Sequence, residues 1–286
     1  MFKRVMVAVV GLPLLILILG WAPSWATMLL LAAMCAIGAW ELMRAAAGEK
    51  GRPLIPLAVI AAALVPVCVY LEESIANAAL TALPELPFVG LLGAVFIFVA
   101  FALAIHRYDE ERGIPFAAVT CAIFAGLVFP LMLSCLLRLR MMPAIGMLNV
   151  FLPLAISFGS DTFALFAGML CGKHKLAPKV SPKKTVEGAI GGLIGGVIGV
   201  TLLHLIASSL GRIILQSPLQ ILVYGIVGSA ISQIGDLSFS VIKREFGVKD
   251  YGHLLPGHGG ILDRFDSVTF AAPAVWLTLQ LTVYCF

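Results

Sequence analysis

The sequence predicts an all-α, polytopic integral membrane protein with about nine transmembrane helices. Hydrophobic residues make up 61% of the chain and charged residues only 12%, and the mean hydropathy is +1.06. These values exclude an ordinary soluble domain. Apolar runs of about 20 residues, the length that crosses the hydrocarbon core of a bilayer, follow one another along the chain. Because the charged residues gather in a few segments, we expect one polar site facing one side of the membrane.

About nine apolar segments are long enough to be expected as spans. They lie near residues 5–22, 25–43, 54–71, 87–106, 115–137, 147–171, 187–210, 217–235 and 267–286. Proline and glycine interrupt several of them, which membrane helices tolerate where neighbours satisfy the freed backbone groups. Lys3 and Arg4 before the first segment also fit a signal peptide, but tryptophan and proline stand where a cleavage site needs small residues. We therefore expect the first segment to remain as a span.

The distribution of positive charge predicts the orientation. If the N-terminus is cytoplasmic, every lysine and arginine falls on a cytoplasmic segment except Arg138, Arg140 and Arg212. Cytoplasmic segments carry the excess of Lys and Arg in membrane proteins, so we expect the N-terminus inside and the C-terminus outside. Both long polar segments, 172–186 and 236–266, then face the cytoplasm. The net charge of +4 is explained by basic segments beside anionic lipid, and no nucleic-acid partner is expected.

The chain is expected to contain two regions within one membrane-embedded unit. Residues 1–140 would form N-terminal transmembrane helices, and residues 141–286 a C-terminal catalytic region. The span after the first polar segment carries two stripes of glycine at every fourth position: Gly188, Gly192, Gly196 and Gly191, Gly195, Gly199. Such stripes let helices approach at backbone contact. We expect them to pack within one chain, and a dimer interface is the alternative.

The longest polar interruption runs from Ser240 to Asp266. It combines lysines, arginines and acids with several glycines and Pro256, which rule out one continuous helix. Asp263 and Asp266 stand three residues apart, a spacing at which two carboxylates on a helical turn can share a hard cation. Carboxylates that hold Mg²⁺, beside cations that hold phosphate oxygens, are what metal-assisted phosphate chemistry needs.

The same stretch resembles the signature of the phosphatidate cytidylyltransferase family. The matching positions are Ser240, Lys243-Arg244, Lys249-Asp250, Gly252, Leu255-Pro256, His258-Gly259-Gly260 and Asp263-Arg264-Phe265-Asp266. So many fixed positions in one segment argue against a chance match. The resemblance implies a membrane enzyme that joins CTP and phosphatidate to give CDP-diacylglycerol and pyrophosphate. It also implies that Asp236 is a metal ligand alongside Asp263 and Asp266.

A second polar segment precedes the glycine-rich span. Its lysines are Lys173, Lys175, Lys179, Lys183 and Lys184. Basic residues beside a membrane often only set orientation and meet lipid headgroups. Here Ser181, Lys184 and Thr185 stand just before an expected helix start, where free N–H groups favour an anion. The Ser-Pro-x-Lys-Thr-x-x-Gly sequence also resembles a second block of the same family, which is expected near the nucleotide.

Other polar residues have less defined roles. Asp161 lies inside an apolar span, where a carboxylate is costly, so it is a functional candidate; the alternative is a structural hydrogen bond to a neighbouring Ser or Thr. His258 is expected to donate to a phosphate oxygen or to orient Asp263, because no second histidine or cysteine stands at a zinc-binding spacing. Glu41 is expected to be an ordinary polar residue at a span end.

The expected roles combine these groups with the resemblance. Catalysis is assigned to Asp236, Lys243, Asp263 and Arg264, and metal binding to Asp236, Asp263 and Asp266. Substrate binding is assigned to Lys173, Lys175, Ser181, Lys184, Thr185, Arg244, Lys249, Asp250, His258, Gly259 and Gly260. The expected cofactor is Mg²⁺, with or without a second monovalent or divalent cation. The lipid phosphate would attack the α-phosphorus of CTP in line, without a covalent enzyme intermediate.

Two other functions share some of these features. A CTP-dependent polyprenol or diacylglycerol kinase would use the same cations and acids but transfer the γ-phosphoryl group and release CDP. An anion transporter fits the many spans, although its polar groups would be expected near mid-membrane in two related halves. We expect a bacterial inner-membrane protein that receives phosphatidate from the inner leaflet and CTP from the cytosol. The family resemblance makes a homodimer the expected assembly.

Overall fold

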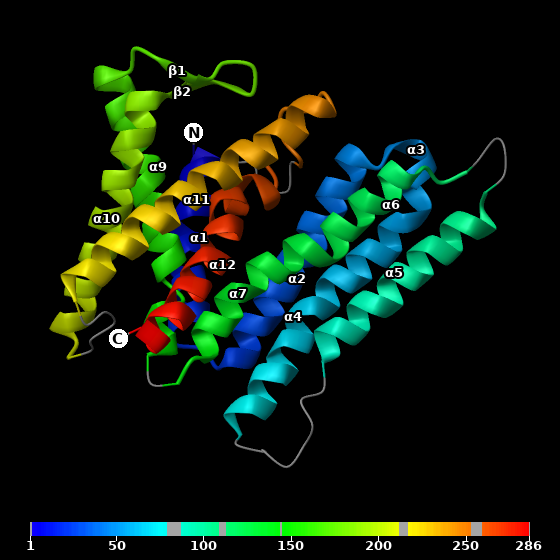
Figure 1. Cartoon of the computed structure of the whole chain (residues 1–286), viewed down its shortest axis with the longest axis horizontal. Helices are drawn as coiled ribbons and strands as arrows, with labels where there is room; N and C mark the ends of the chain where they lie inside the picture. Colours follow the sequence, from blue (N-terminus) through cyan, green and yellow to red (C-terminus); the bar gives the residue numbers. More distant parts are fainter. Residues whose placement is uncertain are drawn as a thin grey trace. The chain divides into compact units, whose positions relative to one another are not determined.

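The computed structural model describes residues 2–78, 87–108, 113–143, 145–211, 217–252 and 259–285, and the side chains of those between 11 and 282. These residues are almost entirely helical, and they contain a short antiparallel hairpin. The chain divides into two compact units, whose helices are drawn in Figure 1. The first unit contains the chain up to residue 141 together with 246–264, and the second contains 142–245 and 265–286. The expected division into N-terminal helices and a C-terminal catalytic region stays a prediction.

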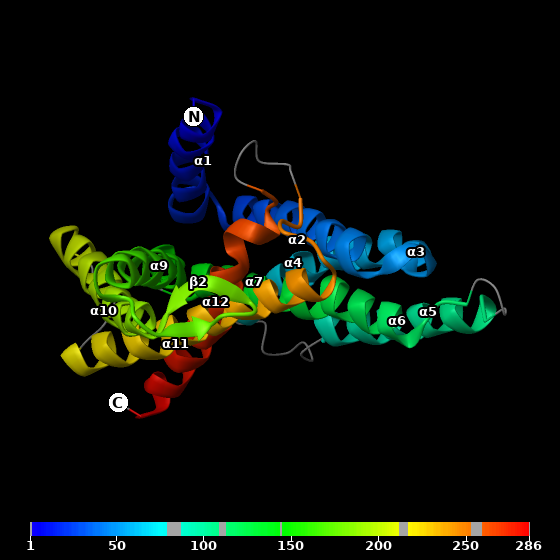
Figure 2. The same cartoon turned by 90° about the horizontal axis from the view of Figure 1, so that it is seen from above.

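The first unit is a bundle of apolar helices. Its elements are α1 (Phe2–Gly20), α2 (Ser24–Ala46), α3 (Gly48–Gly51), the 3₁₀ turn η1 (Arg52–Leu54), α4 (Ile55–Asn77), α5 (Phe88–His106), α6 (Phe116–Ile123), the π-helical η2 (Phe124–Val128) and α7 (Phe129–Met141). Helix α4 packs against α2, α5 and α7, and Figure 2 shows α4, α5 and α6 running alongside one another. Leu42, Val65 and Phe129 are among its fully buried side chains. Dispersion between such closely packed side chains holds membrane helices together.

The second unit carries the hairpin at the ends of two long helices. Its elements are α8 (Gly146–Asn149), α9 (Leu152–Cys171), β1 (Lys175–Ala177), β2 (Ser181–Thr185), α10 (Val186–Ser209), α11 (Pro218–Glu245) and α12 (Leu262–Cys285), of which residues 262–264 belong to the first unit. Helix α10 packs against both α9 and α11. Figure 1 shows β1 and β2 beyond the ends of α9 and α10. The hairpin is not among the elements expected from the sequence.

The glycine stripes of α10 pack within the chain, as expected. A Cβ on Gly195 or Gly199 would collide with a backbone carbonyl oxygen of α9, that of Gly159 or Ala155. A Cβ on Gly196 would lie 2.6 Å from the Ser229 Cβ of α11. The absence of side chains at these positions therefore lets α10 approach α9 and α11 at backbone contact. This close packing holds the start of α10, and with it the hairpin, against its neighbours.

Seven helical segments of the described chain are long and apolar enough to cross a membrane. They are Ser24–Ala46, Gly48–Asn77, Phe88–His106, Phe116–Met141, Gly146–Cys171, Val186–Ser209 and Pro218–Glu245, which correspond to the second to eighth expected spans. Large apolar side chains such as Phe98 and Leu170 remain 74% and 82% exposed, as suits contact with lipid. The chain is an all-α, polytopic integral membrane protein. The first and ninth spans, expected at α1 and α12, stay predictions.

Candidate active site

The basic segment folds into a defined hairpin that leads into α10. Strand β1 pairs antiparallel with β2, with Lys175 opposite Thr185 and Ala177 opposite Ser181. Thr185 is the N-cap of α10, because its hydroxyl oxygen accepts a hydrogen bond from the Gly188 N–H at 3.0 Å. An N-cap of this kind satisfies one of the free donors at a helix start and fixes the entering backbone. The lysines of the hairpin are therefore held at the positive end of a helix dipole.

Glu187 ties the two ends of the hairpin together. Its carboxylate accepts hydrogen bonds from the Lys173 N–H at 3.1 Å and the His174 N–H at 3.2 Å. The His174 ring Nδ1 lies 2.6 Å from the same carboxylate. At the C-terminal end of α11, the Arg244 Nε donates a hydrogen bond to the Val180 carbonyl oxygen at the hairpin turn, over 3.1 Å. These bonds fix the hairpin relative to α10 and α11 within the second unit.

Lys184 and Asp236 form the central charge pair of the second unit. The Lys184 Nζ of β2 lies 2.5 Å from the Asp236 Oδ2 of α11, and each side chain is about one quarter exposed, at 27% and 26%. Partial burial strengthens an ion pair relative to one in open solvent. The Ser240 hydroxyl, one turn further along α11, donates to the other Asp236 oxygen at 3.4 Å. The structure therefore brings together two residues that belong to different polar segments of the sequence.

Two further carboxylates interact electrostatically with Asp236. Asp161 on α9 and Asp266 on α12 both experience its negative charge, and they repel each other. Lys184 offsets part of this repulsion at Asp161, and Lys243 offsets part of it at Asp266. The Ser267 hydroxyl donates to Asp161, while the Ser267 N–H donates to the Asp266 Oδ1 at 2.7 Å. Three acids from three helices of the second unit thus interact with one another and with two lysines.

A pocket of about 460 Å³ opens beside Asp161, Asp236 and Lys184. Its charged lining residues are Asp161, Lys183, Lys184 and Asp236. Thr185 and Gly188 of the α10 start, Gln233 of α11 and the apolar Leu165 and Met169 of α9 complete much of its wall. The volume falls within the range of small-molecule sites. A helix N-terminus with two lysines suits phosphate oxygens, and the acids beside them suit a cation.

Buried hydroxyl and amide groups connect the helices that line this pocket. The Ser229 hydroxyl lies 2.8 Å from both the Ser160 hydroxyl and the Gly192 carbonyl oxygen. The Gln233 amide donates to the Ala189 carbonyl at 3.1 Å, and the Ser232 hydroxyl donates to that of Ser157 at 3.0 Å. Hydrogen bonds between helices satisfy polar groups that would be costly in lipid. This network connects α9, α10 and α11, which carry Asp161, the α10 start and Asp236.

The signature segment of the first unit is organised by two carboxylates. The Asp263 Oδ2 accepts hydrogen bonds from the Tyr251 N–H at 2.8 Å and the Gly260 N–H at 3.0 Å. Gly259, at a φ of 85°, adopts the left-handed conformation that glycine tolerates best. Glu41 of α2 accepts hydrogen bonds from the Ile261 N–H at 3.2 Å and the Leu262 N–H at 3.0 Å. Asp263 and Glu41 together close the turn that starts α12.

The expectation that Glu41 is an ordinary polar residue at a span end is wrong. Its side chain is only 1% exposed. A Cβ on Gly252 or on Gly260 would collide with its carboxylate, so both glycines are needed for the segment to reach it. The acid also lies at the start of α12, where the helix dipole favours negative charge. One charged residue inside an apolar span was the available signal, the same signal that singled out Asp161.

Comparison with known proteins decides the family. A family model described as the cytidylyltransferase family matches residues 2–282. The chain belongs to this cytidylyltransferase family. The phosphatidate cytidylyltransferase of Bacillus subtilis (strain 168) is 30% identical over 194 residues, which cover 66% of this chain and 67% of that protein. The proteins of the same name from Rickettsia prowazekii and Rickettsia typhi are 31% and 36% identical, over 64% and 63% of this chain and 80% and 78% of their own lengths.

The remaining residues expected in the cytidylyltransferase site fall into three groups. Lys173 and Lys175 lie on the hairpin and Arg244 at the end of α11, all with exposed side chains. Lys249, Asp250 and Arg264 are exposed residues of the first unit. His258 lies outside the described residues. Gln233 and the four serines that bond between the helices were not predicted, although small polar residues within apolar spans are a recognisable signal.

The chemistry of the acids fits a hard divalent cation. Carboxylate oxygens are the preferred ligands of Mg²⁺, and a cation would relieve the repulsion among Asp161, Asp236 and Asp266. As arranged in the described part of the chain, no three His, Cys, Asp or Glu side chains form a group that could hold one metal ion. Of the expected ligands, Asp263 belongs to the first unit, and Asp236 and Asp266 belong to the second. The three-aspartate metal site therefore stays a prediction.

Proposed function

We propose that this protein transfers the cytidylyl group of CTP to phosphatidate, giving CDP-diacylglycerol and pyrophosphate. The observation that carries the proposal is the pocket at the α10 N-terminus, where Lys183 and Lys184 lie beside Asp161 and Asp236. It is supported by the family of the chain and by the names of its relatives. In this reaction a phosphate oxygen of phosphatidate forms a bond to the α-phosphorus of CTP. The bond from that phosphorus to the bridging oxygen breaks, and pyrophosphate leaves with the electron pair.

The lipid phosphate is already an anionic nucleophile, so the protein has little proton transfer to perform. Its task is to bring two polyanions together and to neutralise the charge that develops on the leaving pyrophosphate. Lys184 is suited to this task because it can exchange part of its contact with Asp236 for a phosphate oxygen. The N-terminal turn of α10 adds the positive end of its dipole. Lys243 and Arg264 are proposed to neutralise further phosphate charge.

The proposed cofactor is Mg²⁺, with or without a second cation, held by Asp236, Asp263 and Asp266. When bound, a divalent cation supplies positive charge next to phosphate oxygens. The other proposed substrate contacts are Lys173, Lys175, Ser181, Thr185, Arg244, Lys249, Asp250, His258, Gly259 and Gly260. The hydroxyl of Thr185 already caps α10, so its proposed part is to hold the helix start beside the nucleotide phosphates.

The reaction is proposed to occur at the cytoplasmic face of a bacterial inner membrane. Phosphatidate would enter from the inner leaflet and CTP from the cytosol, with the N-terminus inside and the C-terminus outside. A homodimer is the proposed assembly. The excess of Lys and Arg on the expected inner segments supports this orientation.

The test is pyrophosphate release by the detergent-purified chain. CTP is supplied with and without phosphatidate, first with Mg²⁺ and then with a chelator. Release that needs both the lipid and the metal is the expected result, and the lipid product should contain the cytidylyl group. Formation of CDP and a phosphorylated lipid when diacylglycerol replaces phosphatidate would instead identify a lipid kinase. Folded protein that releases neither product would overturn the proposal and make anion transport the next assay.

A further inference from the structure

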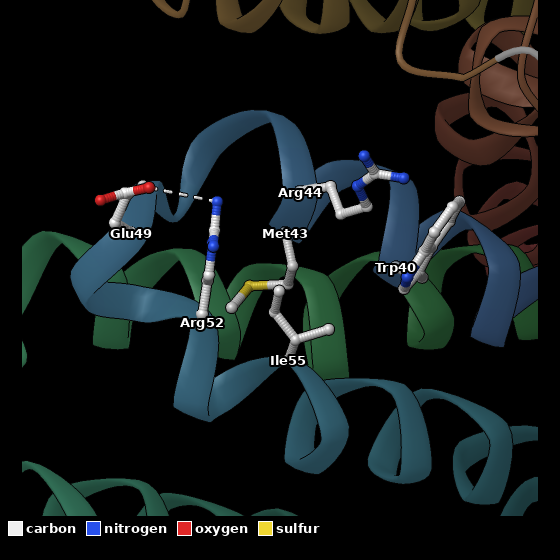
Figure 3. Close-up of a pocket in the computed structure, with 7 residues that line it drawn as sticks. Trp40, Met43, Arg44, Glu49, Arg52 and Ile55 are labelled. Carbon is white, nitrogen blue, oxygen red and sulfur yellow. Dashed lines mark ion pairs between the residues drawn. The ribbon is translucent and has the colours of Figure 1, made fainter.

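A second pocket, of about 620 Å³, lies in the first unit where α2 turns into α4. Its lining residues are Trp40, Met43, Arg44, Gly48, Glu49, Arg52 and Ile55 (Figure 3). None of them belongs to the signature segment or to the hairpin, and the proposed reaction uses none of them. The pocket therefore needs a separate explanation.

The corner that forms this pocket is tightly packed. Gly48 has a φ of 62°, in the left-handed region, which lets the chain turn sharply after α2. Gly51 is buried, and a Cβ there would lie 2.8 and 2.9 Å from the Cβ atoms of Ala47 and Ala118. Leu54 has no exposed surface. The backbone around the pocket is thus held in place by close contacts on its inner side.

The charged side chains that line the pocket carry a net positive charge. Two guanidinium groups, those of Arg44 and Arg52, face one carboxylate, that of Glu49. The Arg52 Nη2 lies 3.3 Å from the Glu49 Oε1, but the two side chains are 70% and 87% exposed. An exposed ion pair of this kind contributes little free energy. Arg52 can therefore exchange its ion pair with Glu49 for one with a more highly charged anion at a small cost in free energy.

Arg44 is held by an aromatic ring and makes no ion pair with any residue that the structure describes. Its Cζ lies 4.7 Å from the centroid of the Trp40 ring, a cation–π contact. Stacking on an aromatic face leaves the guanidinium N–H groups able to donate in their own plane. The contact thus orients Arg44 without consuming its hydrogen-bonding capacity.

The pocket combines these cations with apolar surface at a membrane boundary. Figure 3 shows Met43 and Ile55 between Arg52 on one side and Arg44 with Trp40 on the other. The spans Ser24–Ala46 and Gly48–Asn77 meet here, so the pocket lies where the chain turns back at one membrane surface. Trp40 is 43% exposed, and tryptophan is typical of the headgroup level of a bilayer.

We propose that this pocket binds the phosphate group of an anionic phospholipid. A guanidinium fork matches phosphate geometry and forms charge-assisted hydrogen bonds. The adjacent Met43 and Ile55 offer apolar surface to the start of an acyl chain, which a soluble phosphate compound would not use. This site is additional to the one proposed for phosphatidate and CTP, and it does not depend on that activity.

Tryptophan fluorescence can test the proposal on the full chain in lipid vesicles. Trp21→Phe, Trp25→Phe and Trp276→Phe leave Trp40 as the reporter. Quenching is compared between brominated phosphatidylglycerol and brominated phosphatidylcholine, each in unbrominated phosphatidylcholine. We expect Trp40 to select phosphatidylglycerol by about tenfold or more, as two arginine–phosphate contacts near a membrane surface would give. Arg44→Gln and Arg52→Gln should each lower this selectivity by about fivefold.

Lys50→Gln is the matched control, because Lys50 is an exposed cation of α3, between the two arginines in the chain, but does not line the pocket. It should change the selectivity by less than about twofold if binding is specific to the pocket. An equal loss of selectivity in Lys50→Gln and in the arginine variants would show that the selectivity comes from general surface charge, and would overturn the proposal. Unchanged selectivity in both arginine variants would overturn it as well. Displacement of the lipid by millimolar glycerol phosphate would assign the site to a soluble phosphate ligand instead.

Discussion

Glu41 on α2 accepts a hydrogen bond from the backbone N–H of Leu262, the first residue of α12, over 3.0 Å and 221 positions of sequence. The buried acid caps the helix that carries Asp263 and Asp266, and it also fills the space beside Gly252 and Gly260. The signature segment of this cytidylyltransferase family member is thereby anchored to an N-terminal helix. Glu41 is a positioning residue by this geometry, because its contacts are made with the backbone of the segment.

Glu41→Gln should lower turnover while leaving the protein inserted. Glutamine has one acceptor oxygen where the carboxylate has two, so one buried N–H at the start of α12 loses its partner, at a cost of about 1–3 kcal/mol. Because that cost falls on the signature segment, we expect kcat to fall by roughly tenfold or more. The measurement is CTP-dependent pyrophosphate release. Glu49→Gln, which alters an acid that is 87% exposed, is the control and should match the parent, and parental turnover in Glu41→Gln would contradict the positioning role.

Asp263→Asn should nearly abolish the reaction without unfolding the signature segment. The asparagine oxygen can still accept the N–H groups of Tyr251 and Gly260, which now bond to one Asp263 oxygen. The negative charge needed for a cation is lost, so turnover should fall by roughly a hundredfold or more, with weaker dependence on Mg²⁺. A magnesium titration of kcat would show both effects. Glu245→Gln, at the exposed end of α11, serves as the control; turnover near the parental level in Asp263→Asn would remove Asp263 from the metal site.

Lys184→Ala should chiefly raise the KM for CTP. Lys184 lines the pocket at the α10 start and is the cation paired with Asp236. Loss of one charge-assisted contact to a phosphate should raise the KM by about tenfold or more. Steady-state kinetics at saturating phosphatidate give the value. Lys179→Ala removes an exposed lysine of the hairpin turn that does not line the pocket, and equal effects from both variants would assign the segment to membrane orientation alone.

Gly196→Ala should destabilise the second unit. The added Cβ would lie 2.6 Å from the Ser229 Cβ and 2.8 Å from the Gly225 carbonyl oxygen, so α10 and α11 would have to separate. Overpacking of this kind costs about 1–3 kcal/mol, and the hydrogen bond from Ser229 to the Gly192 carbonyl would be strained with it. The temperature of half-inactivation in detergent should fall by several degrees. In the control Gly93→Ala the added Cβ would lie 3.9 Å from its nearest neighbour, so the half-inactivation temperature should not change. An unchanged half-inactivation temperature in Gly196→Ala would show that α10 and α11 can move apart without loss of stability.

Several features of this protein could be predicted from local sequence, because each depends on residues that are neighbours in the chain. Seven of the expected spans coincide with described apolar helices, since the length of an apolar run directly sets whether a helix can cross a bilayer. The family was also predictable, because its signature between Ser240 and Asp266 is contiguous. The glycine stripes of α10 predicted close helix packing for the same reason.

The tertiary structure alone decided which polar groups meet. Lys184 and Asp236 are far apart in sequence and form a pair because α10 brings the hairpin beside α11. Glu41 reads as an isolated acid until the packing of α2 places it under the N–H groups of Ile261 and Leu262. Composition and periodicity describe which face of a helix is apolar, but the partner of a buried charge is set by helix crossings that no local pattern encodes. The sequence thus determined the membrane architecture and the family, and the packing of the helices decided the geometry of the candidate site.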